Sequence, residues 1–481
     1  MQKAGPDPLR WKALAVLGIA YLMVVLDVSI VNVALPSIQK DLHFSTENLQ
    51  WVVSGYALTF GGFLLLGGRA GDLLGRRRLF MAGLAFFAVA SLLCGLSVSS
   101  GMLIAMRLIQ GAAGAVLSPS VFSITSVTFE EGTERNKALG ILGAIAGSGA
   151  AIGVLLGGVL TEWAGWEWIF FVNVPIGLGA LLLVPRVVRE SHAEGLTQHF
   201  DAAGATTVTA SLMLFVFGLT QSTSHGWSSG QVIGSLLVSA VLMVVFFGIE
   251  SRSRSPLVPL SIFRRRTLFG ANAVGFGLGT SVFGAFFLLS LYMQQVLGFS
   301  ALKTGVGYLA IALTVVVASG ISQALVTRAG VKPVLAFGLL VMAGGLAYLS
   351  QVSAHGSYFG DLFPGFLLLG VGLGFSFVPV SIAALGGVPP HEAGLASGLI
   401  NTSQQIGGAL GLAILVTVST THTNHLLDSG RAKPEALVAG FSLAFWVAVG
   451  VAVVAFAATL VLLRRQDLRQ LQPEPAAAGA H

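Results

Sequence analysis

The sequence predicts an all-α integral membrane protein with 14 transmembrane helices, arranged as two six-helix bundles plus two inserted helices. Three observations predict this class: an apolar composition, apolar runs of spanning length along the whole chain, and an uneven distribution of Lys and Arg. Hydrophobic residues make up 54% of the 481 residues and charged residues only 10%, with a mean hydropathy of +0.85. A soluble domain carries about 25% charged residues, so the composition excludes a soluble protein.

Apolar runs long enough to cross a hydrocarbon core of about 30 Å recur along the chain with short polar breaks. The fifth and thirteenth runs are rich in glycine. The run after the first 11 residues is too long for a signal-peptide core, so we expect no cleaved signal. Helices are expected at 12–35, 49–68, 79–98, 102–127, 137–161, 168–187, 202–221, 231–249, 268–292, 303–326, 333–352, 360–382, 393–417 and 438–463.

The basic residues predict how the chain is oriented. With the amino terminus placed in the cytoplasm, the ends and loops on that side carry 21 of the 26 Lys and Arg, and the outer loops carry four. The remaining one, Arg107, lies within a helix. This bias is what the positive-inside rule requires, so both termini are expected to be cytoplasmic in a multi-pass protein of the cell membrane. Orientation also accounts for the net charge of +6, and no nucleic-acid partner is expected.

An internal repeat divides the chain. Three glycines recur 258 residues later at the same spacing, namely Gly140, Gly149 and Gly153, then Gly398, Gly407 and Gly411. The expected division is an N-terminal six-helix bundle (1–187), two inserted linker helices with cytoplasmic loops (188–267), a C-terminal six-helix bundle (268–465) and a disordered cytoplasmic tail (466–481). A substrate cavity is expected between the bundles near mid-membrane.

The first helix contains one carboxylate in an apolar run, YLMVVLDVSIVNVALP at 21–36. An ionised carboxylate at the depth of Asp27 costs at least about 2.5 kcal/mol, and such residues mark ion pathways or face a partner. We interpret Asp27 as a protonatable site in a transport pathway, and a structural Asp that braces the helix is the alternative. Arg107, a little over one turn into the fourth helix, is expected at a similar depth and needs a counter-charge, which Asp27 can supply directly or through water. Gln110, one turn away on the same face, extends the polar path.

The loop between the second and third helices reads GRAGDLLGRRRL at 68–79. Its spacing places Asp72, Arg76 and Arg77 in a tight turn that Gly68 and Gly75 permit. The arginines can pair with Asp72 or with lipid headgroups. Anchoring of the topology is the alternative, but it explains the arginines and not Asp72.

The fifth helix carries glycines at a spacing that lets a neighbouring helix approach closely. The residues singled out are Gly149, Gly153, Gly157 and Gly158. Ordinary membrane packing accounts for most of this pattern, and a sliding or bending gate is the further interpretation. WEWIFFVNVPIG at 166–177 opens the sixth helix with interfacial tryptophans and a kink at Pro175.

Together these motifs resemble the major facilitator superfamily, in its 14-helix branch of drug:proton antiporters. The resemblance spans nearly the whole chain and includes WVVSGYAL at 51–58, PLVPLSIFRRRTLFGAN at 256–272 and GLASGLINTSQQIGGALG at 394–411. It implies that Asp27 is the proton-exchange carboxylate and Arg107 its basic partner. It also implies that the loop at 68–79 is the cytoplasmic gate motif and that the fifth helix is the antiporter motif.

Two positions depart from the family pattern. Val154 stands where the motif of the fifth helix has proline, which weakens the bending interpretation, and Glu167 stands where the family often has a basic residue. Members that take divalent cations carry extra acids in later helices, whereas 304–326 and 393–417 contain no Asp or Glu. Neutral, anionic or monocationic amphipathic substrates are therefore expected.

Candidates for substrate contact are polar or aromatic residues expected to face the cavity. They are Asn32, Trp51, Tyr56, Gln110, Gln294, Gln295, Asn401, Gln404 and Gln405. Asn401 and Gln405 share one helix face, which indicates either cavity lining or hydrogen bonding between helices. No metal site is expected, because the single Cys94 lies in an apolar run, and His422 and His425 are placed in a solvated outer loop.

The predicted function is export of lipophilic drugs or antibiotics in exchange for protons, by alternating access. No cofactor is expected, because the proton gradient replaces ATP and the chain has no GxxxxGK[ST] loop. The expected partners are a small lipophilic substrate, protons and membrane lipids, and the protein is expected to act as a monomer. A transporter of the same fold for a siderophore, peptide or lipid is the alternative. A channel or a membrane-embedded enzyme is more remote, since no Ser/His or His/Asp grouping stands in the short loops.

Overall fold

The computed structural model describes residues 8–44, 49, 51–130, 132–191, 201–253, 256, 258, 262, 265–386, 388–389 and 392–463, and every regular element within them is helical. The α-helices are Arg10–Asp41 (α1), Trp51–Leu74 (α3), Arg76–Gly95 (α4), Ser100–Thr128 (α5), Thr133–Trp163 (α6), Trp168–Phe171 (α7), Asn173–Val187 (α8), Ala202–His225 (α9), Gly230–Glu250 (α10), Arg266–Leu291 (α11), Ala301–Ala329 (α12), Val331–Leu349 (α13), Phe363–Leu385 (α14), Ala393–Asp428 (α15) and Lys433–Leu462 (α16). Two π-helical segments, Tyr292–Val296 and Tyr358–Leu362, extend α11 and precede α14.

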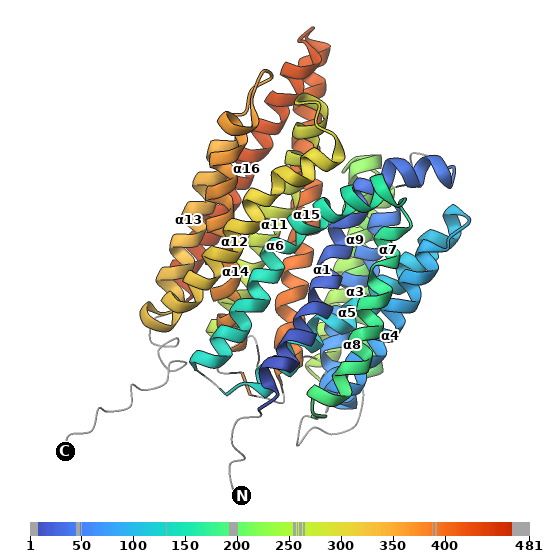
Figure 1. The fold of residues 1–481 in the computed structure, drawn as a ribbon, viewed down its shortest axis with the longest axis vertical. Coiled ribbons are helices and arrows are strands. Elements are labelled where there is room, and N and C mark those ends of the chain that lie inside the picture. Colours follow the sequence, from blue (N-terminus) through green and yellow to red (C-terminus); the bar gives the residue numbers. More distant parts are fainter. Residues whose placement is uncertain are drawn as a thin grey trace, which may run out of the picture.

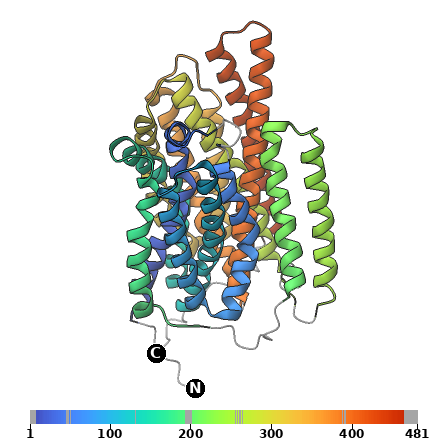
Figure 2. The ribbon, with the colours of Figure 1, turned by 90° about the vertical axis from the view of Figure 1, so that its right-hand side faces the viewer.

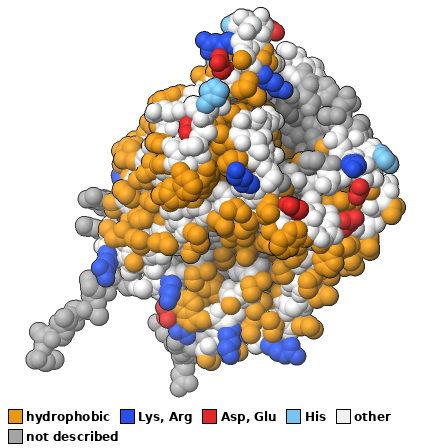
Figure 3. All heavy atoms as spheres, turned by 45° about the horizontal axis from the view of Figure 1, so that its top comes forward, with side chains coloured by type: hydrophobic (Ala, Val, Ile, Leu, Met, Phe, Trp, Pro, Cys, Tyr) orange, Lys and Arg blue, Asp and Glu red, His pale blue; other side chains and the backbone are white. Residues whose placement is uncertain are grey.

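Among the described residues, 13 segments are long and apolar enough to cross a membrane, with α7 and α8 counted as one. The fourteenth predicted span is α6, an apolar helix of 31 residues that is also long enough to cross a membrane. It packs along α1 on one side and α12 on the other. Figure 3 shows hydrophobic side chains in a broad band over the middle of the molecule, with charged side chains at its two ends.

The two halves of the chain lie side by side, with α4 and α8 on one flank and α13 and α16 on the other (Figure 1). Arg10 of α1 and Leu462 of α16 begin and end the described helices at the same end, here called the terminal end, and the opposite end is called the far end. The halves meet where α6 packs against α12 and α14, and where α3 and α5 pack against α15.

The two helices between the halves form a hairpin on the flank of the molecule (Figure 2). Helix α9 packs against both α3 and α15, and α10 packs against α9. Trp51 of α3 lies against Phe217 of α9 with ring centroids 5.8 Å apart, and Trp227 donates a hydrogen bond of 3.2 Å to Thr417 of α15. The hairpin therefore contacts both halves as well as connecting them.

Among the predicted boundaries that were wrong, two change the interpretation of a motif. Helix α3 continues through Gly68 to Leu74, so the sequence 68–74 is helical and the turn lies at Gly75 alone, with φ +103°. Helix α15 extends to Asp428, so His422 and His425 lie on this helix and not in a loop. In both cases a polar or glycine-rich sequence was taken as a break, whereas packing against neighbouring helices stabilises the helix beyond it.

Candidate functional site

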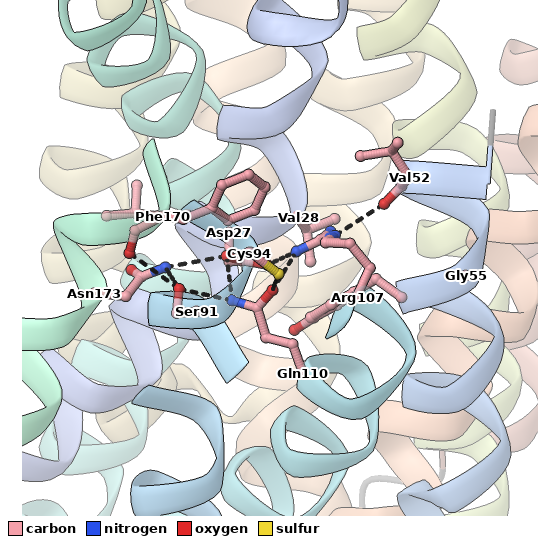
Figure 4. Close-up of polar contacts among 12 residues, drawn as sticks. Asp27, Val28, Val52, Gly55, Ser91, Cys94, Arg107, Gln110, Phe170 and Asn173 are labelled. Atoms are coloured by element: carbon pink, nitrogen blue, oxygen red, sulfur yellow. Dashed lines mark hydrogen bonds and ion pairs between the residues drawn. The ribbon is translucent and has the colours of Figure 1, made fainter. Parts of the chain in front are cut away.

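The buried carboxylate of Asp27, in the middle of α1, is the centre of a polar group within the N-terminal half (Figure 4). Its Oδ2 is paired with the guanidinium of Arg107 on α5. Its Oδ1 accepts hydrogen bonds from Nε2 of Gln110 at 2.8 Å and from Nδ2 of Asn173 at 3.1 Å. Since all three partners donate, the surroundings fit the ionised carboxylate. The predicted contact between Asp27 and Arg107 is thus present and direct.

Arg107 is fully buried and satisfied by groups from several helices. Its Nε donates to the carbonyl of Val52 at 2.8 Å, and Nη1 donates to Oε1 of Gln110 at 2.7 Å. Its guanidinium also lies over the ring of Tyr56, 4.4 Å from the centroid. A guanidinium stays protonated in proteins, so these acceptors hold a permanent positive charge beside Asp27.

Ser91 on α4 forms a second layer behind the carboxylate. Its hydroxyl donates to the carbonyl of Phe170 at 3.0 Å and accepts from Gln110 at 3.0 Å and Asn173 at 2.9 Å. The thiol of Cys94, one turn further along α4, lies 3.6 Å from Oε1 of Gln110. The polar group therefore joins α1, α4, α5 and α8.

Asn173 enters the site because the sixth span is broken. The helix is interrupted at Val172, and Asn173 is the first residue of α8. Pro175 explains the break, because it lacks the N–H that would bond the carbonyl of Phe171 and its ring crowds that carbonyl. The kink at Pro175 was predicted from the sequence, whereas Asn173 and Ser91 were not predicted as site residues. Asn173 could have been found in the sequence as a side-chain amide close to a helix-breaking proline in an apolar segment.

The polar group separates two apolar clusters. The larger one includes Tyr21, Met23 and Val24 of α1 and continues toward the terminal end. The smaller one, here called the far cluster, consists of Ile30, Val31, Ala34, Ile38, Phe44, Val52, Cys94, Leu103, Trp166, Ile169 and Phe170. It covers Asp27 from the far end, so the Asp27 side chain is 0% exposed.

The glycines of α6 seat this helix on α1 beside Asp27. A Cβ at Gly149 would collide with Val25, and one at Gly153 would collide with Ser29 Oγ and lie 3.0 Å from the carbonyl of Leu26. A Cβ at Gly157 would lie 2.6 Å from the carbonyl of Ile30. Gly158 is buried on the same helix, which runs unbroken through Val154. Close packing on both sides of Asp27 is therefore what these glycines provide.

The segment predicted as a gate motif contacts both halves. A Cβ at Gly68 would lie 2.5 Å from the carbonyl of Gly394 on α15, so glycine permits the close approach of α3 and α15. Arg76 is buried and donates to Ser123 at 2.7 Å. The backbone N–H of Arg77 donates to Glu190 at 3.0 Å. Glu190 follows α8 in the sequence and contacts the amino end of α4. This partner of Arg77 was not predicted from the sequence. The Asp72 side chain lies outside those described.

The substrate candidates do not form one group. Tyr56 and Gln110 belong to the Asp27 group, whereas Trp51 packs against α9. Asn401 accepts a hydrogen bond of 3.0 Å from Ser118 of α5, which favours interhelical bonding over cavity lining for this residue. Gln404 and Gln405 are half-buried, and Asn32, Gln294 and Gln295 are exposed. No group of three or more His, Cys, Asp or Glu side chains that could hold a metal occurs in the described part of the chain.

The family model of the Major Facilitator Superfamily matches residues 17–412. The puromycin resistance protein of Streptomyces alboniger is 39% identical over 464 residues, which cover 95% of this chain and 91% of the relative. The cephamycin export protein of Amycolatopsis lactamdurans is 39% identical over 414 residues, 84% of each chain.

Among solved structures, a human organic anion transporter superposes with a TM-score of 0.68 and covers 94% of this chain and 100% of its own. A proton:xylose symporter superposes with a TM-score of 0.66 over 96% of this chain and 98% of its own. Their identities of 16% and 13% make these likenesses of fold alone.

Proposed function

Since the chain belongs to the Major Facilitator Superfamily, we propose that it exports a lipophilic antibiotic or drug across the cytoplasmic membrane in exchange for protons. The observation that carries the proposal is the fully buried ion pair of Asp27 and Arg107. An ion pair at this depth is costly, and in transport proteins such residues mark ion pathways. The names of the puromycin and cephamycin relatives support the class of cargo.

The proton enters the mechanism through the charge of Asp27. Protonation removes the negative charge that Arg107 pairs with and converts one acceptor oxygen of the carboxyl into a donor. The three donors around Asp27 suit the ionised form better than the neutral one, so protonation weakens the contacts that join α1 to α5 and α8. The proton and the cargo favour different arrangements of these helices. Because each binds one of the two conformational states of the protein more tightly, one is exchanged for the other.

The conformation described here supports closure at the terminal end. Ser118 donates to Asn401 at 3.0 Å, and Ser397 donates to the carbonyl of Pro119 at 2.9 Å, so α5 and α15 are joined between the halves. We assign the terminal end to the cytoplasm, because Lys and Arg concentrate there in the sequence. In this assignment the contacts between α5 and α15 must break for cargo to enter from the cytoplasm.

The cargo is expected to carry no more than one positive charge. Within the spans of the C-terminal half, carboxylates occur only near helix ends, at Asp361, Asp428 and Glu435. A dication would find Asp27 as the one deep carboxylate, and Arg107 already neutralises it. The protein is proposed to work as a monomer with membrane lipids around it.

Inverted membrane vesicles test the proposal directly. A pH gradient is imposed, and puromycin, a cephamycin and a lipophilic dye are added in turn while the lumenal pH is recorded. Cargo is expected to dissipate the gradient with the wild type and not with Asp27→Asn. Asp41→Asn is the matched control, because Asp41 lies on the same helix but only accepts from Trp166 at 2.9 Å. Exchange that persists in Asp27→Asn would show that another group carries the proton.

A further inference from the structure

Asn173 and Gln110 are arranged in the same way around the Asp27 carboxylate. The amide nitrogen of Gln110 lies 2.8 Å from Asp27 Oδ1 and 3.0 Å from Ser91 Oγ. The amide nitrogen of Asn173 lies 3.1 Å from the same Oδ1 and 2.9 Å from the same Oγ. Two amides, from α5 and α8, thus bridge one carboxylate oxygen and one hydroxyl, and the four polar atoms form a closed ring (Figure 4).

The hydrogen-bonding capacity of this ring is fully used. Each amide nitrogen has two hydrogens, and both have an acceptor in the ring. Ser91 Oγ has one hydrogen, which goes to the carbonyl of Phe170 at 3.0 Å, and two lone pairs, which the amides occupy. Ser91 has no hydrogen left for the carboxylate, so the ring offers Asp27 two donors and no acceptor.

We propose that Asn173, held in place by Ser91, is a positioning residue that stabilises the ionised form of Asp27 and so sets the pH at which the transporter releases its proton. The inference rests on the proposed role of Asp27 as the proton site. Asn173 differs from Arg107 because it supplies no charge and lies on α8, beyond the break before Pro175. A movement of α8 relative to α1 therefore changes the number of donors that the carboxylate receives without breaking the ion pair.

Infrared difference spectroscopy of the purified full-length protein in nanodiscs tests this without any cargo. The carbonyl stretch of a protonated carboxyl is followed as the pH is varied, and the part lost in Asp27→Asn is assigned to Asp27. Asn173→Ala is expected to move the titration midpoint of that band toward alkaline pH by about one unit, because a hydrogen bond to the charged form is lost. Ser91→Ala is expected to move it in the same direction by less, since both amides remain but lose their anchor.

Two further variants separate positioning from general damage. In the double variant Asn173→Ala with Ser91→Ala, the shift is expected to be less than the sum of the single shifts, because the two residues act through one contact. Ser211→Ala removes an equally buried hydroxyl that bonds the carbonyl of Ser239 at 2.8 Å between α9 and α10, and it should leave the midpoint unchanged.

The outcomes distinguish the two proposals. If a band assigned to Asp27 titrates in the wild type but keeps its midpoint in both Asn173→Ala and Ser91→Ala, the role of Asn173 is overturned and that of Asp27 stands. If no band depends on Asp27 over the accessible pH range, both proposals are overturned.

Discussion

Asp27 and Arg107 are 80 residues apart in the sequence and form a fully buried ion pair between α1 and α5. The pair lies in a polar layer between two apolar clusters, where an unpaired charge would be strongly destabilising. It bonds directly to Val52 of α3 and Asn173 of α8, and a second layer adds Ser91 of α4 and the carbonyl of Phe170 of α7. A change in the charge of Asp27 therefore acts on most of the N-terminal half at once.

The first prediction separates the stability of this pair from its function. Arg107→Gln leaves the carboxylate unpaired and is expected to lower the free energy of unfolding by about 3–5 kcal/mol. The double variant Asp27→Asn with Arg107→Gln removes both charges, so it should regain most of the thermal stability but none of the proton exchange. Thermal unfolding in detergent and the vesicle assay measure the two quantities. A double variant that exchanges protons would show that the pair is structural.

The second prediction concerns the contact between α6 and α1. Gly153→Ala places a methyl group against Ser29 Oγ and 3.0 Å from the carbonyl of Leu26, so it should reduce both stability and transport. Ser29→Ala removes the colliding oxygen and is expected to restore part of the loss. Gly18→Ala is the matched control on the same helix pair, because its Cβ would meet only the flexible end of Ile145 at 3.3 Å. Equal effects of Gly153→Ala and Gly18→Ala would contradict the importance of the site beside Asp27.

The sequence was sufficient for the spans and for the pairing of Asp27 with Arg107, because both follow from the cost of placing charge in hydrocarbon. A long apolar run must cross the membrane, and two opposite charges buried at the same depth in one bundle must contact each other. Asn173 and Ser91 could not be predicted in this way. A neutral amide or hydroxyl in a membrane helix can bond its own backbone, as Asn32 does with the carbonyls of Val28 and Ser29 at 3.3 Å.

Glycine was ambiguous for a related reason. The sequence motif placed Gly68 and Gly75 together in a turn, but a glycine also serves where two helices approach closely. Gly75 has positive φ and makes the turn, whereas Gly68 is helical and lies against Gly394. Only the tertiary contact distinguishes the two uses, and α15 is more than 300 residues away in the sequence.

The third prediction tests closure at the terminal end. Ser118 and Asn401 are bonded across the two halves at 3.0 Å. In a Cys94→Ala background, Ser118→Cys with Asn401→Cys should be joined by a short thiol crosslinker, and transport should cease and return on cleavage of the link. The single cysteine variants treated in the same way should keep transporting. Continued transport by the crosslinked protein would mean that α5 and α15 do not separate during the cycle.

The fourth prediction concerns the far cluster as a barrier to protons. Leu103 lies in this cluster and is fully buried, on the same helix as Arg107 and one turn from it. Leu103→Ala opens space on the side of Asp27 that faces the far end, so water should reach the carboxylate without a conformational change. In liposomes with an imposed pH gradient and no cargo, the variant is expected to leak protons faster than the wild type, because the surrounding side chains refill the cavity only in part. Asp27→Asn added to Leu103→Ala should abolish that leak, because the path then has no group to carry the proton.

Leu139→Ala, which truncates an equally buried leucine of the larger cluster on α6, is the control and should not leak. A leak in Leu139→Ala as well would assign the effect to general loosening of the bundle, and a tight Leu103→Ala would show that the far cluster is not the barrier.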